Sequence, residues 1–254
     1  MLIESHAPRL VFEDDDLLVV DKPGNMVCHS PQRPGQASLA TWVRERGVVT
    51  PRLINRLDRE TSGLVVIAKT ERAAKRLGRQ VRRREIEKEY LAICWGEIAA
   101  DRGVIDQPIG LAEDSAVYTR RAVDPVAGKP SVTEFVVTAR LPGTLACNTC
   151  STLASKGWTV MRVRARTGRT HQVRVHLAWL GHPIVGDKVY GPDETLYLQF
   201  IERGVTAEML EKLLLPRHAL HAARVACRHP RTQEQVEFTA PLPADMEEFI
   251  EARQ

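Results

Sequence analysis

The continuous apolar run LVVIAK, at Leu64 to Lys69, constrains the fold of this 254-residue chain more than any other feature. It has the length of a β-strand, and its five successive apolar residues predict a strand that is buried on both faces. The polar stretch NRLDRETSG, at Asn55 to Gly63, leads directly into it. One interpretation of that stretch is a surface turn shaped by Asp58. The other is that Asp58 is a catalytic carboxylate.

Further strands and helices are predicted before and after this run. RLVFEDDDLLVVDKPGNMV predicts two strands joined by an acidic turn and followed by a Pro-Gly turn. ASLATWVRERG predicts a short helix that ends at Gly47. Another helix is predicted after Thr70, a suitable N-cap residue. The apolar stripe of that helix would consist of Ala73, Ala74, Leu77 and Val81.

The second half of the chain has the same mixed character. YLAICWGEI, SVTEFVVTARL and WTVMRVRART predict strands, and in the last of these apolar residues alternate with Arg162, Arg164 and Arg166. TGRTHQVRVHLAWLG predicts a helix capped by Thr170 and closed by Gly181. A helix at 206–216, a terminal hairpin and a short closing helix follow. Neighbouring strands with interspersed helices favour an α+β fold over a regular βαβ alternation.

The composition excludes several classes of protein. The apolar fraction of 43% and the charged fraction of 27% are those of an ordinary soluble globular protein. The chain has no run of 18 apolar residues, so no membrane span is predicted. The N-terminus lacks the features of a secretory signal, so we expect a cytoplasmic protein.

Neither a metal nor a cofactor is expected. The five cysteines include a lone CxxC at Cys147 to Cys150, which lacks the second pair of a zinc site, and Cys227 with His229 is a weak candidate. His171 and His176 are five residues apart, whereas a zinc-binding helix spaces its histidines by four. The chain also lacks a glycine-rich phosphate loop and a dinucleotide-binding fingerprint.

Positive charge is concentrated in two segments. Residues 69–90 contain nine Lys and Arg against four acidic residues, and residues 160–176 contain five arginines and no acid. Each segment has a net charge of +5, so the rest of the chain sums to −6 within the overall +4. Two solvated faces would account for this, but the concentration favours a polyanionic partner such as nucleic acid.

Six sequence blocks, in order over residues 11–243, together resemble the RluA/RluC/RluD family of RNA pseudouridine synthases. NRLDRETSG is similar to the family's H-R-L-D-x-x-T-S-G signature, with Asn55 where the family often has His. The other blocks are VFEDDDLLVVDKPGNMVCH, EKEYLAICWG, AGKPSVTEFVV, RTGRTHQVRVHLAWLGHPIVGDKVYG, and HALHAARVACRHP with EQVEFTAPLP. The resemblance implies the pseudouridine synthase fold, with a central mixed and mainly antiparallel sheet, flanking helices and an active-site cleft across the sheet.

The resemblance also implies roles at the reaction centre. Asp58 matches the catalytic aspartate, which would attack the anomeric carbon or carbon 6 of the target uridine, or assist glycal formation. Tyr90 matches a tyrosine that packs on the flipped base and acts as a general base. Arg174 matches the arginine that forms an ion pair with the aspartate, and we expect Tyr90 and Arg174 to converge on Asp58.

Other residues are expected to bind the RNA. Arg56 matches a residue that fills the gap left by the flipped nucleotide, which offsets part of the cost of extruding the base. Arg169, His171 and Gln172 lie near the predicted start of a helix, where phosphates bind well. Arg82, Arg83 and Arg84 would contact the RNA backbone around the flipped base.

The activity implied by the resemblance is the isomerisation of uridine to pseudouridine in structured ribosomal or transfer RNA. We expect a single catalytic domain over residues 1–254, without an N-terminal accessory RNA-binding domain, that acts as a monomer. Two other functions remain open. A non-catalytic RNA-binding protein is supported by Asn55 alone, and a glycoside hydrolase would need a second carboxylate, for which Glu60 is a poor candidate.

Overall fold

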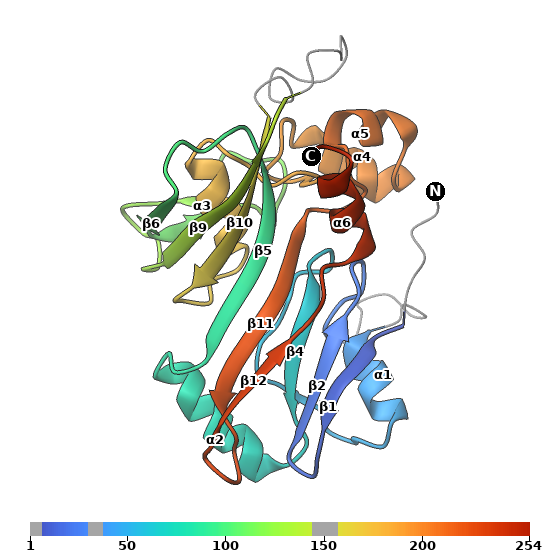
Figure 1. Ribbon diagram of the computed structural model, residues 1–254, viewed down its shortest axis with the longest axis vertical. Coiled ribbons are helices and arrows are strands. Elements are labelled where there is room, and N and C mark those ends of the chain that lie inside the picture. The colour runs from blue at the N-terminus through green and yellow to red at the C-terminus, as the bar shows by residue number, and fades with distance from the viewer. Residues whose placement is uncertain (1–6, 30–37, 144–156) are drawn as a thin grey trace. The chain divides into compact units, whose positions relative to one another are not determined.

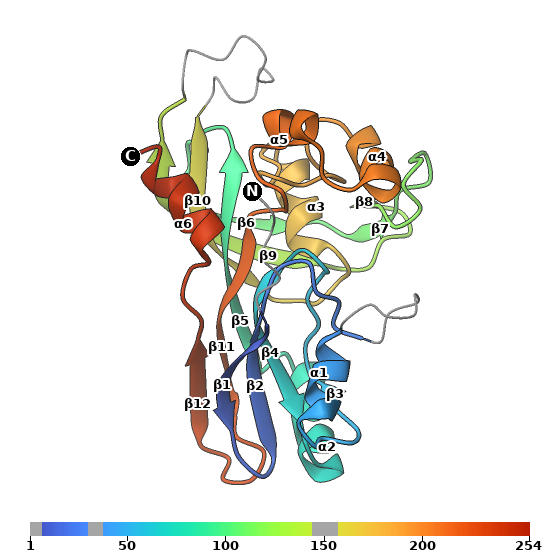
Figure 2. The ribbon, with the colours of Figure 1, turned by 90° about the vertical axis from the view of Figure 1, so that its right-hand side faces the viewer.

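The computed structural model describes residues 7–29, 38–143 and 157–254. The chain divides into two compact units. The first comprises Met1–Glu89 and His221–Pro241, and the second comprises Tyr90–Leu220 and Leu242–Gln254. Figures 1 and 2 show the chain from two directions. The Cys147 to Cys150 pair lies outside the described residues.

The first unit is a sheet with two helices. Its strands are β1 (Arg9–Glu13), β2 (Leu17–Lys22), β3 (Arg52–Leu53), β4 (Ser62–Ala68), β11 (Leu220–Arg228, of which Leu220 belongs to the second unit) and β12 (Gln235–Thr239). The order is β1-β2-β4-β11, with β3 on β4 and β12 on β11. Only the pairing of β4 with β11 is parallel among these strands, with His221 opposite Ser62. The helices are α1 (Leu39–Glu45) and α2 (Glu71–Arg82).

Strand β4 is the most deeply buried element of this unit. All seven of its residues are buried, as the LVVIAK run predicted. Leu64 and Val66 pack in one core cluster with residues of β2, α2 and β11. Because β4 is central and rigid, a loop attached to its first residue is held in place by the sheet.

Helix α2 begins as predicted but buries a different stripe. Thr70 caps the helix, since its side chain accepts a hydrogen bond from Ala73 N at 3.1 Å. Ala73 and Leu77 are buried, but Val81 is 44% exposed, which corrects the predicted stripe. Gln80 is buried in its place because its amide pairs with the backbone of Arg228, 148 residues away in the sequence.

The second unit contains further strands and has its own core. Its strands are β5 (Glu87–Trp95, which starts in the first unit), β6 (Arg102–Asp106), β7 (Ile109–Leu111), β8 (Arg121–Val123), β9 (Val132–Leu141) and β10 (Trp158–Ala165). The order is β5-β10-β9-β6, and β7 pairs with β8 separately. The helices are α3 (Gln172–Trp179), α4 (Thr195–Arg203), α5 (Ala207–Leu213) and α6 (Ala244–Glu251). On β10, Met161 and Val163 are fully buried and Arg162 is exposed, as the alternation predicted.

The predicted α+β class, with mixed and mainly antiparallel pairing and flanking helices, is confirmed. The terminal hairpin of β11 with β12 and the closing helix α6 are also present. Helix α4 was not predicted. No helix in the described ranges is long and apolar enough to cross a membrane.

Candidate active site

Asp58 lies in the loop that connects β3 to β4. The side chain is half-buried, between buried Leu57 and exposed Arg59. Thr61 N donates to Asp58 O at 3.2 Å, and β4 begins at the next residue, Ser62. The loop is therefore a short connection that ends on the most buried strand of the unit, which is not the free surface turn of the alternative interpretation.

Buried Lys22 fixes the residue that follows Asp58. Its ammonium group donates to Pro23 O at 2.8 Å, Met26 O at 2.9 Å and Arg59 O at 3.3 Å. The side chain has no exposed surface. An ammonium group has three donors, and these three carbonyl groups accept from it. Lys22 therefore ties the Asp58 loop to the turn after β2, a contact that sequence analysis missed.

Cys28 fixes the residue that precedes Asp58. Its thiol donates to Leu57 O, and Leu57 N donates back to the sulfur, both at 3.4 Å. Burial raises the pKa of the Cys28 thiol, so it stays protonated and keeps its donor. With Leu57 and Arg59 both anchored, the backbone of Asp58 is held on each side.

Asn55 is bound to β4 by both ends of its amide. Nδ2 donates to Leu64 O at 2.9 Å, and Oδ1 accepts from Val66 N at 2.8 Å. The side chain thereby continues the antiparallel ladder that Leu53 forms with Ile67. This residue, which departs from the resembling motif, is thus a structural clamp at the start of the Asp58 loop.

The Thr-Ser-Gly segment is part of the sheet. Ser62 and Gly63 are the first residues of β4. Gly63 has φ +110°, and a Cβ there would lie 2.4 Å from Ala222 O on β11. Only glycine suits that combination of backbone conformation and close approach. Ser62 Oγ also bonds His221 Nδ1 at 2.9 Å, so the segment secures β4 against β11.

In the second unit, Arg174 is a buried guanidinium that is held on two sides. Its Nε and Nη2 donate to Asp187 at 2.6 and 2.8 Å, and it lies 4.9 Å from the centre of the Tyr190 ring. Burial alone would raise the pKa of Asp187, but the Arg174 charge and its hydrogen bonds hold that pKa far below the ordinary value.

Gln172 organises the start of α3. Its Oε1 accepts from Thr167 Oγ1 at 2.7 Å and from Arg169 N at 3.1 Å. Its Nε2 donates to Val132 O at 2.9 Å and to Thr133 Oγ1 at 3.0 Å. The side chain is 4% exposed, so the contacts favour a positioning role for Gln172 over the predicted direct contact with RNA.

The N-cap of α3 is His171, which corrects the prediction of Thr170. His171 adopts a left-handed conformation, with φ 58°, and its side chain makes no capping bond. Its Nδ1 instead contacts the Tyr190 hydroxyl at 2.9 Å. The same hydroxyl accepts a hydrogen bond from Arg121 N at 2.9 Å. Arg169, beside it, is partly exposed and donates to Pro130 O.

The expected site residues fall into three groups. Asp58 and exposed Arg56 share one loop of the first unit, and Arg169, His171, Gln172 and Arg174 share the start of α3 in the second. Tyr90 is half-buried on β5, against the core of the second unit. The expected convergence of Tyr90 and Arg174 on Asp58 involves residues of both units, so it stays a prediction.

Arg82 to Arg84 do not lie beside the Asp58 loop. The three arginines lie at the C-terminal end of α2. Gln80, in the same part of the helix, bonds the backbone of Arg228, at the far end of β11 from His221. Since His221 pairs with Ser62, the three arginines are at the opposite end of the sheet from the loop. The prediction that they contact RNA next to the flipped base needs revision.

No candidate metal site is found in the described part of the chain. That part contains no cluster of three His, Cys, Asp or Glu side chains suited to a metal ion. His229, the weak zinc candidate with Cys227, instead bonds Asp14 Oδ2 at 2.8 Å.

Comparison with known proteins gives consistent matches. A family model described as RNA pseudouridylate synthase matches residues 16–179. The chain is 38% identical to the ribosomal large subunit pseudouridine synthase D of Vibrio cholerae, over 95% of the chain and 69% of that protein. For the enzyme of the same name from Pasteurella multocida, the values are 36%, 96% and 70%. Among solved structures, human RNA pseudouridylate synthase domain containing 1 matches with a TM-score of 0.70 and 26% identity, over 99% of this chain and 96% of that one.

Proposed function

The chain belongs to the RNA pseudouridylate synthase family, and from this premise we propose that it converts uridine to pseudouridine in the RNA of the large ribosomal subunit. The relatives named for that substrate support the choice of ribosomal RNA. The sequence leaves transfer RNA open as well, and a direct assay distinguishes the two substrates. The two units would act as one catalytic domain over residues 1–254, as a cytoplasmic monomer without a metal or cofactor.

Asp58 is the proposed catalytic carboxylate. The bond between N1 of uracil and the anomeric carbon breaks, the base rotates, and a bond forms from carbon 5 to the same carbon. Carbon 5 then loses its hydrogen and N1 gains one, so the reaction is an isomerisation. A carboxylate can act as a nucleophile in such a step. The observation that carries this assignment is the anchoring of both neighbours of Asp58, by Cys28 and Lys22.

The other roles follow from the chemistry of the side chains. Arg174 would stabilise the ionised Asp58, since a nearby guanidinium favours the charged form of a carboxyl group. Tyr90 would pack on the flipped base and accept the hydrogen from carbon 5. Arg56, which is exposed, would occupy the space left in the RNA. Arg169 and His171 would bind nearby phosphates.

The substrate is tested with the purified full-length chain and unmodified transcripts of large-subunit ribosomal RNA and of transfer RNAs. We expect pseudouridine to form at defined positions of the ribosomal transcript, as detected by chemical mapping. Formation in transfer RNA alone would overturn the substrate assignment. The absence of pseudouridine from every transcript would overturn the proposed function.

A further inference from the structure

Helix α2 presents a basic face that the proposed chemistry does not use. It consists of six basic residues, five within the helix and one at its C-cap: Arg72, Lys75, Arg76, Arg79, Arg82 and Arg83. Their spacing of three, four or seven residues places them along one side of the helix, away from buried Ala73 and Leu77. We call this set the α2 stripe.

Much of the positive charge of the α2 stripe is not neutralised. Lys75 pairs with Glu71 at 2.7 Å, and Arg83 lies 3.8 Å from Glu85. Arg72, Arg79 and Arg82 are exposed and form no ion pair with any described residue. The stripe also borders an open hollow of about 410 Å³, lined by Glu71, Arg72, Lys75, Arg76 and Arg79.

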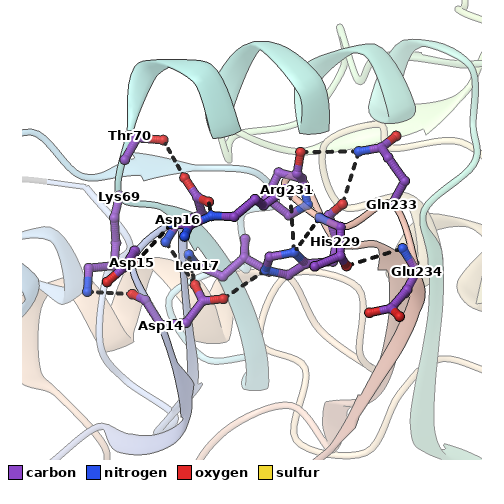
Figure 3. A network of polar contacts seen from close by, with 12 residues as sticks. Asp14, Asp15, Asp16, Leu17, Lys69, Thr70, His229, Arg231, Gln233 and Glu234 are labelled. Carbon is purple, nitrogen blue, oxygen red and sulfur yellow. Dashed lines mark hydrogen bonds and ion pairs between the residues drawn. The ribbon is translucent and has the colours of Figure 1, made fainter.

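The helix is fixed at both ends to the same end of the sheet. At its start, Thr70 Oγ1 donates to Asp16 Oδ1 at 2.9 Å, and Asp16 accepts from Arg231 Nε at 2.6 Å. Figure 3 shows this network, in which His229 also reaches Asp14. Near its end, Gln80 binds the backbone of Arg228. The stripe is therefore a rigid surface.

The stripe lies at a defined separation from the Asp58 loop within the first unit. The loop joins β4 at Ser62 and α2 follows the other end, at Ala68. Seven strand residues span about 20 Å, at ~3.3 Å each. Figures 1 and 2 both show α2 at that far end of β4. Stacked nucleotides at ~3.4 Å per step would need about six steps to cover the distance.

We propose that the α2 stripe binds the phosphate backbone of a helical stem of the substrate RNA, about six nucleotides away from the uridine at Asp58. The inference rests on the proposed function in taking RNA as the substrate. The partner follows from charge complementarity, because several unpaired arginines along one rigid helix suit the regularly spaced phosphates of one strand. The stripe would hold and orient the RNA without touching the reacting base.

The test compares two fluorescent RNA hairpins with the same uridine-containing loop and stems of about 4 or about 12 base pairs, of which only the longer covers a separation of about 20 Å. The variant Arg72→Gln/Arg79→Gln is measured against the full-length wild type. The control, Arg102→Gln/Arg203→Gln, removes two exposed arginines of the second unit.

We expect the α2 variant to bind the long hairpin about tenfold more weakly and the short hairpin as the wild type does. The slope of log affinity against log salt for the long hairpin should shrink by about 1 to 2. Equal binding of the long hairpin by variant and wild type would overturn the proposal, and so would an equal loss in the control. Because binding is read without turnover, these outcomes are distinct from a failure of the proposed isomerisation.

Discussion

Asn55 holds Val66 of the central strand by a hydrogen bond of 2.8 Å from Val66 N to Oδ1, and its Nδ2 binds Leu64 O as well. The amide supplies one acceptor and one donor to two backbone groups that point the same way from β4. The residue that departs from the family signature thus has a definite structural role at the start of the Asp58 loop.

We expect Asn55→Asp to destabilise the chain by about 1 to 3 kcal/mol, because the carboxylate loses the donor to Leu64 O and faces that carbonyl with a negative charge. Urea unfolding at pH 7 measures the loss. The exposed control Gln235→Glu makes the same chemical change and should alter stability by less than about 0.5 kcal/mol. Equal stability of Asn55→Asp and the wild type would contradict the proposed clamp.

Lys22→Met removes the ammonium group that fixes the Asp58 loop and keeps an unbranched apolar stem. We expect kcat to fall by about 10- to 100-fold with RNA affinity little changed, since a displacement of about 1 Å is enough for such a loss. The control Lys69→Met removes a lysine that binds Glu13 and Asp14 at the other end of β4. A kcat that falls equally in both variants would show that the effect is general destabilisation.

Arg174→Lys keeps the positive charge but loses the two-pronged hydrogen bonding to Asp187. We expect the single-turnover rate constant to fall by about 100-fold or more, with a smaller effect on RNA binding. The matched control is Arg217→Lys, because Arg217 is also buried and pairs with Asp245 at 2.7 Å. Wild-type turnover by Arg174→Lys would remove Arg174 from the reaction centre.

The folded chain should lose stability as the pH falls below about 6.5. Burial lowers the pKa of His218 well below its ordinary value, and the charge of Arg174 lowers it further. The unfolded chain binds a proton near pH 6.5 and the folded chain does not, so the contribution is present above that pH and lost below it. Each such histidine contributes up to about 1.4 kcal/mol per pH unit.

Urea unfolding at pH 7.5 and 5.5 checks this dependence. We expect His218→Gln to lose less stability between the two pH values than the wild type, and exposed His29→Gln to lose as much as the wild type. Identical losses in all three proteins would contradict a neutral His218 in the folded chain.

Local patterns predicted much of the fold, and long-range contacts explain what they missed. The strand at LVVIAK and the cap at Thr70 depend on residues within a few positions of each other, so periodicity and capping rules found them. Lys22 bonds a backbone carbonyl 37 residues away, and Gln80 bonds one 148 residues away. Backbone acceptors carry no sequence signature, so these two side chains could not be recognised as anchors from the sequence.

The candidate site shows the same limit. The resemblance identified Asp58 and Arg174 as residues of interest, but the sequence did not indicate that Asp187 and Tyr190 hold the Arg174 guanidinium in place. The burial of Gln172 was missed because its polar amide suggested a surface position. Its four hydrogen bonds to neighbouring groups make that burial tolerable.

The most direct test of the central claim is the release of tritium from RNA labelled at carbon 5 of uridine, measured with the wild type and with Asp58→Asn. The substitution keeps the size of the side chain but removes the carboxylate. We expect the wild type to release tritium as pseudouridine forms, and Asp58→Asn to release none while it still binds the RNA. Tritium release by Asp58→Asn at the wild-type rate would contradict the assignment of Asp58 as the catalytic residue.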